Sequence, residues 1–106
     1  MSEIVLTTEN FDREVLQSPV PVLVDFWATW CPPCKVMGPV VDALIEELQG
    51  ARVGKLNVDD APEIAQRYGI LSIPTFITFK GGEPVKQASG AMAKENLLAL
   101  IQPFIG

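Results

Sequence analysis

Apolar and polar residues alternate along this chain with two different periods. Five short stretches are rich in β-branched and apolar residues, as β-strands are. They are Ile4–Thr7, Val22–Trp27, Arg52–Val58, Thr75–Lys80 and Val85–Ser89. Segments between them carry apolar residues at the spacing of a helix. This alternation of strand and helix patterns predicts an α/β fold with a partly parallel sheet.

The run Val22–Trp27 is apolar throughout except at Asp25. A strand that is apolar on both faces belongs in the middle of a sheet, where other elements cover it from both sides. The last two predicted strands are separated by Gly81 and Gly82, which indicates an antiparallel hairpin. Because Pro84 has no backbone N–H to donate, the final strand is expected at an edge of the sheet.

The segment from Cys31 to Leu48 predicts the longest helix. One broad buried stripe is expected along it, made of Val36, Met37, Val40, Val41, Leu44, Ile45 and Leu48. Pro39 lies inside this pattern and is expected to kink the helix, because it lacks a backbone donor. The apolar run Leu97–Ile101 indicates a closing helix.

Two shorter helices are indicated by residues that favour helix ends. Thr7 or Thr8 can cap a helix that follows the first strand. Asp60 can cap another helix, with Pro62 suited to its first turn and Gly69 to its C-terminal end.

The chain has 106 residues, enough for one domain over residues 1–106 and too few for two. Its formal net charge of −5 argues against nucleic acid and against an anionic membrane as partners, because both select basic patches. No apolar stretch is long enough to span a bilayer, and the first residues lack the basic and apolar regions of a secretory signal. These features favour a cytoplasmic location.

Histidine is absent from the chain, and cysteine occurs twice. The absence of histidine excludes the hydrolase triads that depend on it and removes the commonest metal ligand, so no metal site is expected. The candidate chemistry therefore lies in the two cysteines. They occur where a strand ends and a helix begins, in the stretch Trp30-Cys31-Pro32-Pro33-Cys34-Lys35.

Cysteines three residues apart on a first helical turn project to nearly the same side, close enough to bond each other. Cys31 would sit at the helix N-terminus, where unpaired N–H groups and the helix dipole favour a negative sulfur. Lys35 adds a positive charge nearby. Because the thiolate is the nucleophile, this arrangement predicts that Cys31 and Cys34 form a redox-active pair.

Three other interpretations of the pair are weaker. A structural disulfide that closes so small a loop would remove only about 2 kcal/mol of chain entropy, and the cytosol is reducing. A zinc site normally needs four ligands, and the chain has no further cysteine and no histidine. Two inert buried thiols would not explain a spacing that places both at an exposed helix start.

Asp25 is the acid inside the central predicted strand. Burial disfavours its charged form, so its pKa is expected to be raised. A carboxyl group that titrates nearer neutrality could take the proton from Cys34, whereas the alternative is an aspartate that reaches solvent at the sheet end. Trp27 is interpreted as a core aromatic, and Trp30, adjacent to Cys31, as part of a docking surface.

Together with further motifs in the same order, these residues give a sequence that resembles the thioredoxin family over nearly its whole length. The motifs are Val24-Asp25-Phe26-Trp27-Ala28, Trp30-Cys31-Pro32-Pro33-Cys34-Lys35, Pro39, Lys55-Leu56-Asn57-Val58-Asp59, Tyr68-Gly69-Ile70, Ile73-Pro74-Thr75, Gly82 and Ser89-Gly90. The resemblance implies an α/β thioredoxin fold with a central mixed β-sheet of about five strands flanked by four helices. Strands one to three would be parallel and the last two antiparallel.

The resemblance also implies roles for individual residues. Cys31 would be the attacking thiol, exposed at the tip, and Cys34 the resolving thiol, buried one turn in. Lys55 would lie near the buried Asp25 as an electrostatic partner, although a solvated strand lysine fits the sequence equally well. Pro74 would follow a cis peptide bond, in a loop that faces the dithiol and offers its backbone to an extended target.

The expected docking residues for that target are Trp30, Val58, Ile73, Pro74 and Gly90. The sequence departs from the family at Pro32, where the best-known motif has glycine. Pro32 and Pro33 offer no N–H to a thiolate and stiffen the loop. They are therefore expected to tune the reduction potential, in a direction that the sequence leaves open.

The resemblance implies a cytoplasmic protein-disulfide reductase that maintains the redox state of the cell. A thioredoxin reductase would recharge it with electrons from NADPH, which would bind that enzyme and not this chain. Disulfide-containing proteins would be its targets, and no metal or bound organic cofactor is implied beyond the Cys31–Cys34 disulfide. No oligomerisation segment is evident, which favours a monomer. Two alternatives stay open: an oxidant or isomerase tuned by the double proline, and a binding or scaffold subunit whose thiols play no part.

Overall fold

A computed structural model of the chain describes residues 3–105; Met1, Ser2 and Gly106, which the expected domain 1–106 includes, lie outside the described residues. Five strands form one sheet in the spatial order β1-β3-β2-β4-β5. Their bounds are Ile4–Leu6 for β1, Val22–Trp27 for β2, Arg52–Asn57 for β3, Thr75–Lys80 for β4 and Glu83–Ser89 for β5. The predicted strands are thus all present, within one or two residues of their expected ends.

The sheet is mixed, as expected. Strands β1 and β2 both pair parallel to β3, β4 pairs antiparallel to β2, and β5 pairs antiparallel to β4. The apolar strand β2 lies in the centre and is buried at every position except Trp27, which is half-buried. Strand β5, which carries Pro84, lies at an edge, where a residue without an N–H is tolerated.

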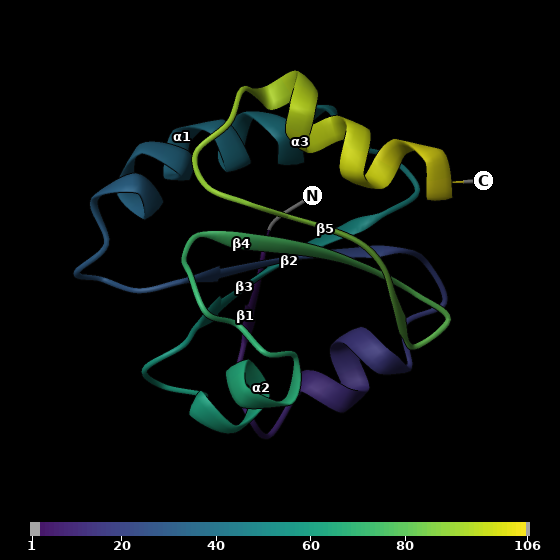
Figure 1. Cartoon of the computed structure of the whole chain (residues 1–106). Coiled ribbons are helices and arrows are strands. Elements are labelled where there is room, and N and C mark those ends of the chain that lie inside the picture. The colour runs from purple at the N-terminus through teal and green to yellow at the C-terminus, as the bar shows by residue number, and fades with distance from the viewer. Residues whose placement is uncertain (1–2, 106) are drawn as a thin grey trace.

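Helices cover both faces of the sheet (Figure 1). The helices α1 (Pro32–Glu47) and α3 (Lys94–Ile101) lie on one face, and a 3-10 turn, η2 (Gln102–Phe104), continues α3. A short π-helix, η1 (Asp12–Leu16), and α2 (Pro62–Arg67) lie on the other face. The four expected helices are therefore present around the sheet.

Alternate side chains of β2 enter two separate cores, because successive residues of a strand point to opposite faces. Leu23 packs in the core beneath α1 and α3, together with Met37, Val41 and Leu97. Val22, Val24 and Phe26 pack in the core beneath η1 and α2, which includes Phe11 and Ile64. By the same alternation, Asp25 lies on the face that α1 covers.

The buried stripe of α1 is narrower than the sequence predicts. Met37, Val41, Leu44, Ile45 and Leu48 are buried and Val40 is half-buried, but Val36 is exposed. Val36 precedes Met37 by one residue, which turns its side chain about 100° away from the line that faces the sheet. Pro39 lies inside the helix, as its place in the sequence requires.

The capping prediction for α2 is wrong in one respect. The residue at its N-cap is Ala61 and not Asp60, and it makes no side-chain capping bond. Asp60 lies one residue too early, in the turn where its N–H donates to the carbonyl of Asn57 at 3.1 Å. Pro62 begins the helix and Gly69 follows its end with a φ of +63°, as predicted.

The capping prediction for η1 is wrong: its N-cap residue is Phe11, which makes no side-chain capping bond, because the chain forms a further turn over residues 8–10 after Thr7. The Thr7 hydroxyl accepts a hydrogen bond from the N–H of Asn10 at 3.1 Å, and the Asn10 side chain accepts one from the N–H of Thr7 at 2.7 Å. Phe11 and Val15 are buried on the side of this segment that faces the sheet.

Among the described residues, none of the helices is both long enough and apolar enough to cross a membrane.

The N-terminus of α3 offers a direct test of local stability. Ala93 occupies the N-cap with an extended backbone and makes no side-chain capping bond. A hydroxyl at this position can accept a hydrogen bond from a free N–H of the first turn, so Ala93→Ser is expected to stabilise the protein by about 1 kcal/mol. Thermal or urea unfolding would measure this gain. Ala91→Ser, a matched change at an exposed position outside the cap, should leave stability unchanged, and equal stability of the two variants would contradict the prediction.

Candidate functional site

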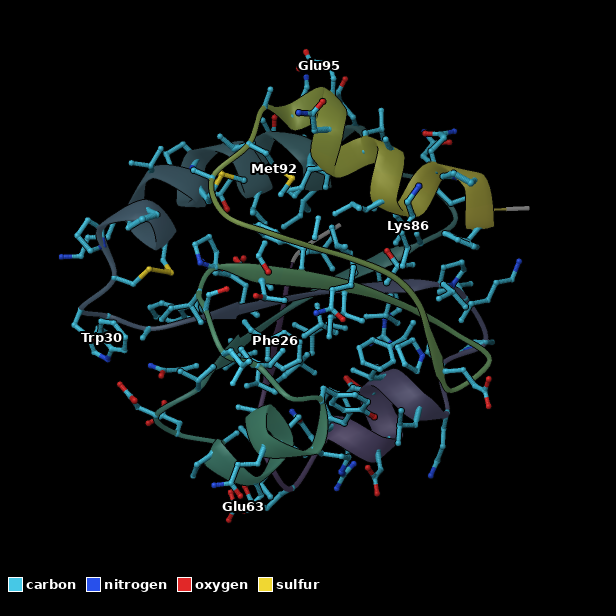
Figure 2. The ribbon with its side chains drawn as sticks, in the orientation of Figure 1. Phe26, Trp30, Glu63, Lys86, Met92 and Glu95 are labelled. Carbon is cyan, nitrogen blue, oxygen red and sulfur yellow. A yellow bond between two sulfur atoms is a disulfide. The ribbon has the colours of Figure 1, made fainter. Side chains whose placement is uncertain are left out.

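Cys31 and Cys34 form a disulfide at the point where the loop after β2 enters α1. Their Cα atoms are 5.3 Å apart, within the ordinary range for a disulfide. Figure 2 shows the bond between the two sulfur atoms at the start of the helix, beside Trp30. The pairing predicted from the three-residue spacing is therefore present.

At the start of α1, one backbone N–H donates a hydrogen bond to the Cys31 sulfur. Cys31 is the N-cap residue, and the N–H of Cys34 donates to its Sγ at 3.2 Å. The N–H of Lys35 donates instead to the Cys31 carbonyl, at 3.3 Å. Because Pro32 and Pro33 have no N–H, Cys34 and the helix dipole supply the backbone stabilisation available to a Cys31 thiolate.

The expectation that Cys31 is exposed at the tip is wrong for this disulfide form. Cys31 is only 2% exposed, and Cys34 is 7% exposed. Side chains from the end of β2 and the residue after it, from the residue after β3 and from the segment before β4 pack around the two sulfurs; they are Trp27, Ala28, Val58 and Ile73. A target therefore has to reach the Cys31 sulfur along the surface that these residues form.

The segment before β4 lies against the dithiol. The Ile73–Pro74 peptide bond is cis, as the resemblance implies, and the Ile73 carbonyl oxygen lies 3.7 Å from the Sγ of Cys31. The Pro74 carbonyl accepts a hydrogen bond from the N–H of Gly90 at 2.8 Å. Gly90 has a φ of +94°, a conformation that favours glycine. Three of the expected docking residues therefore meet here.

An apolar pocket of about 200 Å³ adjoins the dithiol. Three of the expected docking residues line it, namely Trp30, Val58 and Ile73. Pro74 and Gly90 are not among its lining residues. The sequence interpretation missed the other lining residues, which are Ala65, Ile70, Leu71 and Ser72. An apolar run directly after Gly69, outside any predicted strand or helix, is the signal that could have indicated them.

Two large apolar side chains at this pocket face solvent. Leu71 is 99% exposed and Trp30 is 65% exposed. Figure 2 shows Trp30 at the outer edge of the molecule. Its indole N–H donates to the Asp59 carboxylate at 2.9 Å, which orients the ring. Exposed apolar side chains gathered beside a pocket are typical of a surface that binds another protein.

Asp25 is 3% exposed in the middle of the sheet, between Lys55 of β3 and Phe76 of β4. The pKa of Asp25 is raised from 3.8 to about 7. Desolvation by burial is the largest cause of the increase; the positive charge of Lys55 lowers the pKa, and the negative charge of Glu3 raises it. Its Oδ1 atom is buried and has no hydrogen-bond partner among residues 3–105. The raised pKa agrees with the expectation from its apolar surroundings.

Lys55 is half-buried and lies beside Asp25 in the register of β2 and β3. Its Nζ also lies over the ring of Trp27, 5.1 Å from the centroid, in a cation–π contact. Trp27 is half-buried and packs beside the disulfide, so it is not a fully enclosed core residue. The structure therefore brings Lys55 next to Asp25.

Within the described part of the chain, no three histidine, cysteine, aspartate or glutamate side chains gather as metal ligands.

Comparisons with known proteins cover nearly the whole chain. Residues 2–103 match the family model described as Thioredoxin. Thioredoxin of Porphyra purpurea is 47% identical over 106 residues, which are 99% of each chain. Thioredoxin 1 of Nostoc sp. is 50% identical over 101 residues, 94% of each chain. Thioredoxin of Alicyclobacillus acidocaldarius is 52% identical over 95 residues, 89% of this chain and 90% of the relative.

The buried acid predicts a specific dependence of stability on pH. Folded Asp25 keeps its proton up to about pH 7, whereas a solvated aspartate loses it near 3.8, so the protein loses stability as pH rises through this window. The ionised carboxylate should destabilise the fold by up to about 4 kcal/mol at alkaline pH. Asp25→Asn is therefore expected to gain stability, relative to the unchanged protein, as pH rises from about 4 to about 9.

Urea unfolding at a series of pH values would measure this gain. Asp42→Asn, which changes an exposed aspartate of α1, is the matched control and should show no comparable trend. A difference between Asp25→Asn and the unchanged protein that stays constant with pH would contradict the assignment.

Proposed function

The chain belongs to the thioredoxin family and is a thiol–disulfide oxidoreductase, and we propose which of its residues carry out each step of protein-disulfide reduction. The observation that supports the proposal best is the Cys31–Cys34 disulfide at the start of α1, with the N–H of Cys34 directed at the Cys31 sulfur. The whole chain, residues 1–106, would act as a single thioredoxin domain.

In the proposed reaction the dithiol form attacks first. The Cys31 thiolate forms a bond to one sulfur of the target disulfide, and the other target sulfur leaves as a thiolate. The Cys34 thiolate then attacks the Cys31 sulfur, which releases the second target sulfur and forms the Cys31–Cys34 disulfide. Two electrons pass from the protein to the target, and the released thiolates take up protons.

Asp25 is the proposed proton acceptor for Cys34. It lies on the sheet face that α1 covers, and its pKa of about 7 lets it exchange a proton near neutrality. Lys55 would act electrostatically, since its positive charge opposes the effect of burial on the carboxyl group. Pro32 and Pro33 would tune the dithiol by leaving the Cys31 sulfur with the Cys34 N–H as its backbone donor.

The proposed docking surface for a target runs over Trp30, Val58, Ile73, Pro74 and Gly90. Two observations support it. The apolar pocket provides a place for a side chain of the target next to its cysteine. The Gly90 backbone faces open space: apart from its chain neighbours, no atom of residues 3–105 lies within 4 Å of where a Cβ would be, so an extended segment can approach it closely.

Thioredoxins in general act with a reductase and with disulfide-bonded proteins, and they carry a redox-active disulfide without needing a bound cofactor. For this chain we propose a thioredoxin reductase as the electron donor, with NADPH bound to that enzyme. The acidic net charge of −5 supports protein partners over nucleic acid or an anionic membrane. A monomer in the cytoplasm is the proposed state and location.

Replacing either cysteine by serine tests whether Cys31 is the attacking thiol and Cys34 the resolving thiol. Cys31→Ser is expected to abolish reduction of a disulfide-bonded substrate protein, because no nucleophile remains to open its disulfide. Cys34→Ser is expected to accumulate a mixed disulfide through Cys31, because the resolving thiol is missing. Turnover assays and non-reducing gels would measure these outcomes, with the double variant as the control that forms no adduct. Normal turnover by either single variant would rule out the two-cysteine mechanism.

The reduction potential of the Cys31–Cys34 pair distinguishes a reductase from an oxidant or isomerase. It is expected near the value known for thioredoxins, about −270 mV. Tryptophan fluorescence in thiol–disulfide buffers would measure it, since Trp27 packs beside the disulfide. A value between about −180 and −120 mV would indicate an oxidant or isomerase. The variant Pro32→Gly, measured in parallel, would show whether Pro32 causes such a difference.

A further inference from the structure

A second carboxyl group, that of Glu3, lies beside the pair formed by Asp25 and Lys55. In the registered strands, Val5 of β1 is next to Lys55 of β3, and Lys55 is next to Asp25 of β2. Glu3 precedes Val5 by two residues, the spacing at which an extended chain returns to the same face. Glu3 therefore lies on the same face of the sheet as Val5, Lys55 and Asp25, two residues before the β1 member of this row.

A pocket of about 150 Å³ at this edge of the sheet is lined by both Glu3 and Lys55. Trp27, whose ring Lys55 covers, lines the same pocket. The pocket is open on the side of β1, because β1 is an edge strand and Val5 is exposed. Charged groups thus extend from the buried Asp25 toward solvent at this edge of the sheet.

Both carboxyl groups have a buried oxygen without a hydrogen-bond donor among residues 3–105. These atoms are the Oε2 of Glu3 and the Oδ1 of Asp25. A buried carboxylate oxygen without a donor is costly, and a nearby cation reduces that cost. The Lys55 ammonium is the cation that this cluster offers to both groups.

The charges that act on the Asp25 carboxyl come from the β1 and β3 side of the sheet. Lys55 on β3 favours the charged form of the Asp25 carboxyl, and Glu3, ahead of β1, opposes it. Phe76, the neighbour on β4, is apolar, and the Cys31–Cys34 disulfide at the start of α1 carries no charge. Asp60, on the turn after β3, lines the pocket but is exposed to solvent.

We propose that Glu3 is a positioning residue for proton transfer in this protein, because the negative charge of its carboxylate, in the same pocket as Lys55, offsets the positive charge of Lys55 and so keeps Asp25 able to accept a proton near neutral pH. The inference rests on the proposed role of Asp25 as proton acceptor for Cys34. Without Glu3, the positive charge of Lys55 would stabilise the Asp25 carboxylate unopposed, which would make it a weaker base. Glu3 itself does not contact the sulfurs.

The first experiment follows the Asp25 carboxyl directly, by carbon-13 NMR titration of the oxidised protein. In Glu3→Gln the midpoint of the Asp25 titration is expected to move to lower pH, because the opposing negative charge is gone. Glu9→Gln is the matched control, since it removes the same charge from an exposed position of the same N-terminal segment, outside the pocket. Titration curves that coincide for the unchanged protein and for Glu3→Gln would overturn the inference.

The second experiment separates the inference from the role proposed for Asp25. It measures how fast the mixed disulfide is resolved as a function of pH. In Glu3→Gln the profile is expected to move in the same direction as the Asp25 titration, and the shift should vanish when Asp25→Asn is combined with it. If the NMR titration moves while the rate profile stays in place, Asp25 is not the proton acceptor and Glu3 loses its role in the reaction. If the NMR titration does not move, the inference about Glu3 fails and the role of Asp25 stands.

Discussion

The packing of α1 against the central strand β2 is the interaction on which the rest of the site depends. Met37 and Val41 share one core with Leu23, so the helix is held across the sheet along its buried stripe. This contact brings the start of α1 close to the end of β2, where the loop between them is short. The helix N-terminus, with its free N–H groups and its dipole, therefore presents the Cys31 sulfur next to the segment before β4.

The same packing explains why an acid in β2 has unusual chemistry. Asp25 follows Leu23 by two residues, so it enters the covered face of the sheet and loses contact with water. In that setting a charge is strongly influenced by the few groups near it. Lys55 and Glu3 exert opposite effects on the Asp25 carboxyl, and both lie toward the open edge of the sheet. Burial raises the pKa of Asp25, and Lys55 and Glu3 shift it in opposite directions.

Much of the fold was predictable because its signals are local. The apolar run of β2, the paired glycines before β5 and the stripe of α1 each report on a few neighbouring residues. Two of the errors arose at positions one residue away from the one that the structure uses. Asp60 lies one residue before the helix cap, and Val36 lies one residue beside the buried line of α1. A turn of 100° per residue makes such positions differ completely in their surroundings.

The sequence by itself determined the chemistry of this protein: two cysteines at helical spacing, no histidine, and one acid within an apolar strand. Only the tertiary structure decided how accessible and how coupled these groups are. The burial of Cys31, the pocket completed by Leu71, and the grouping of Glu3, Lys55 and Asp25 at one side of the sheet all join segments far apart in the chain. Such contacts depend on strand order and register, which bring distant residues together and which no local pattern of residues encodes.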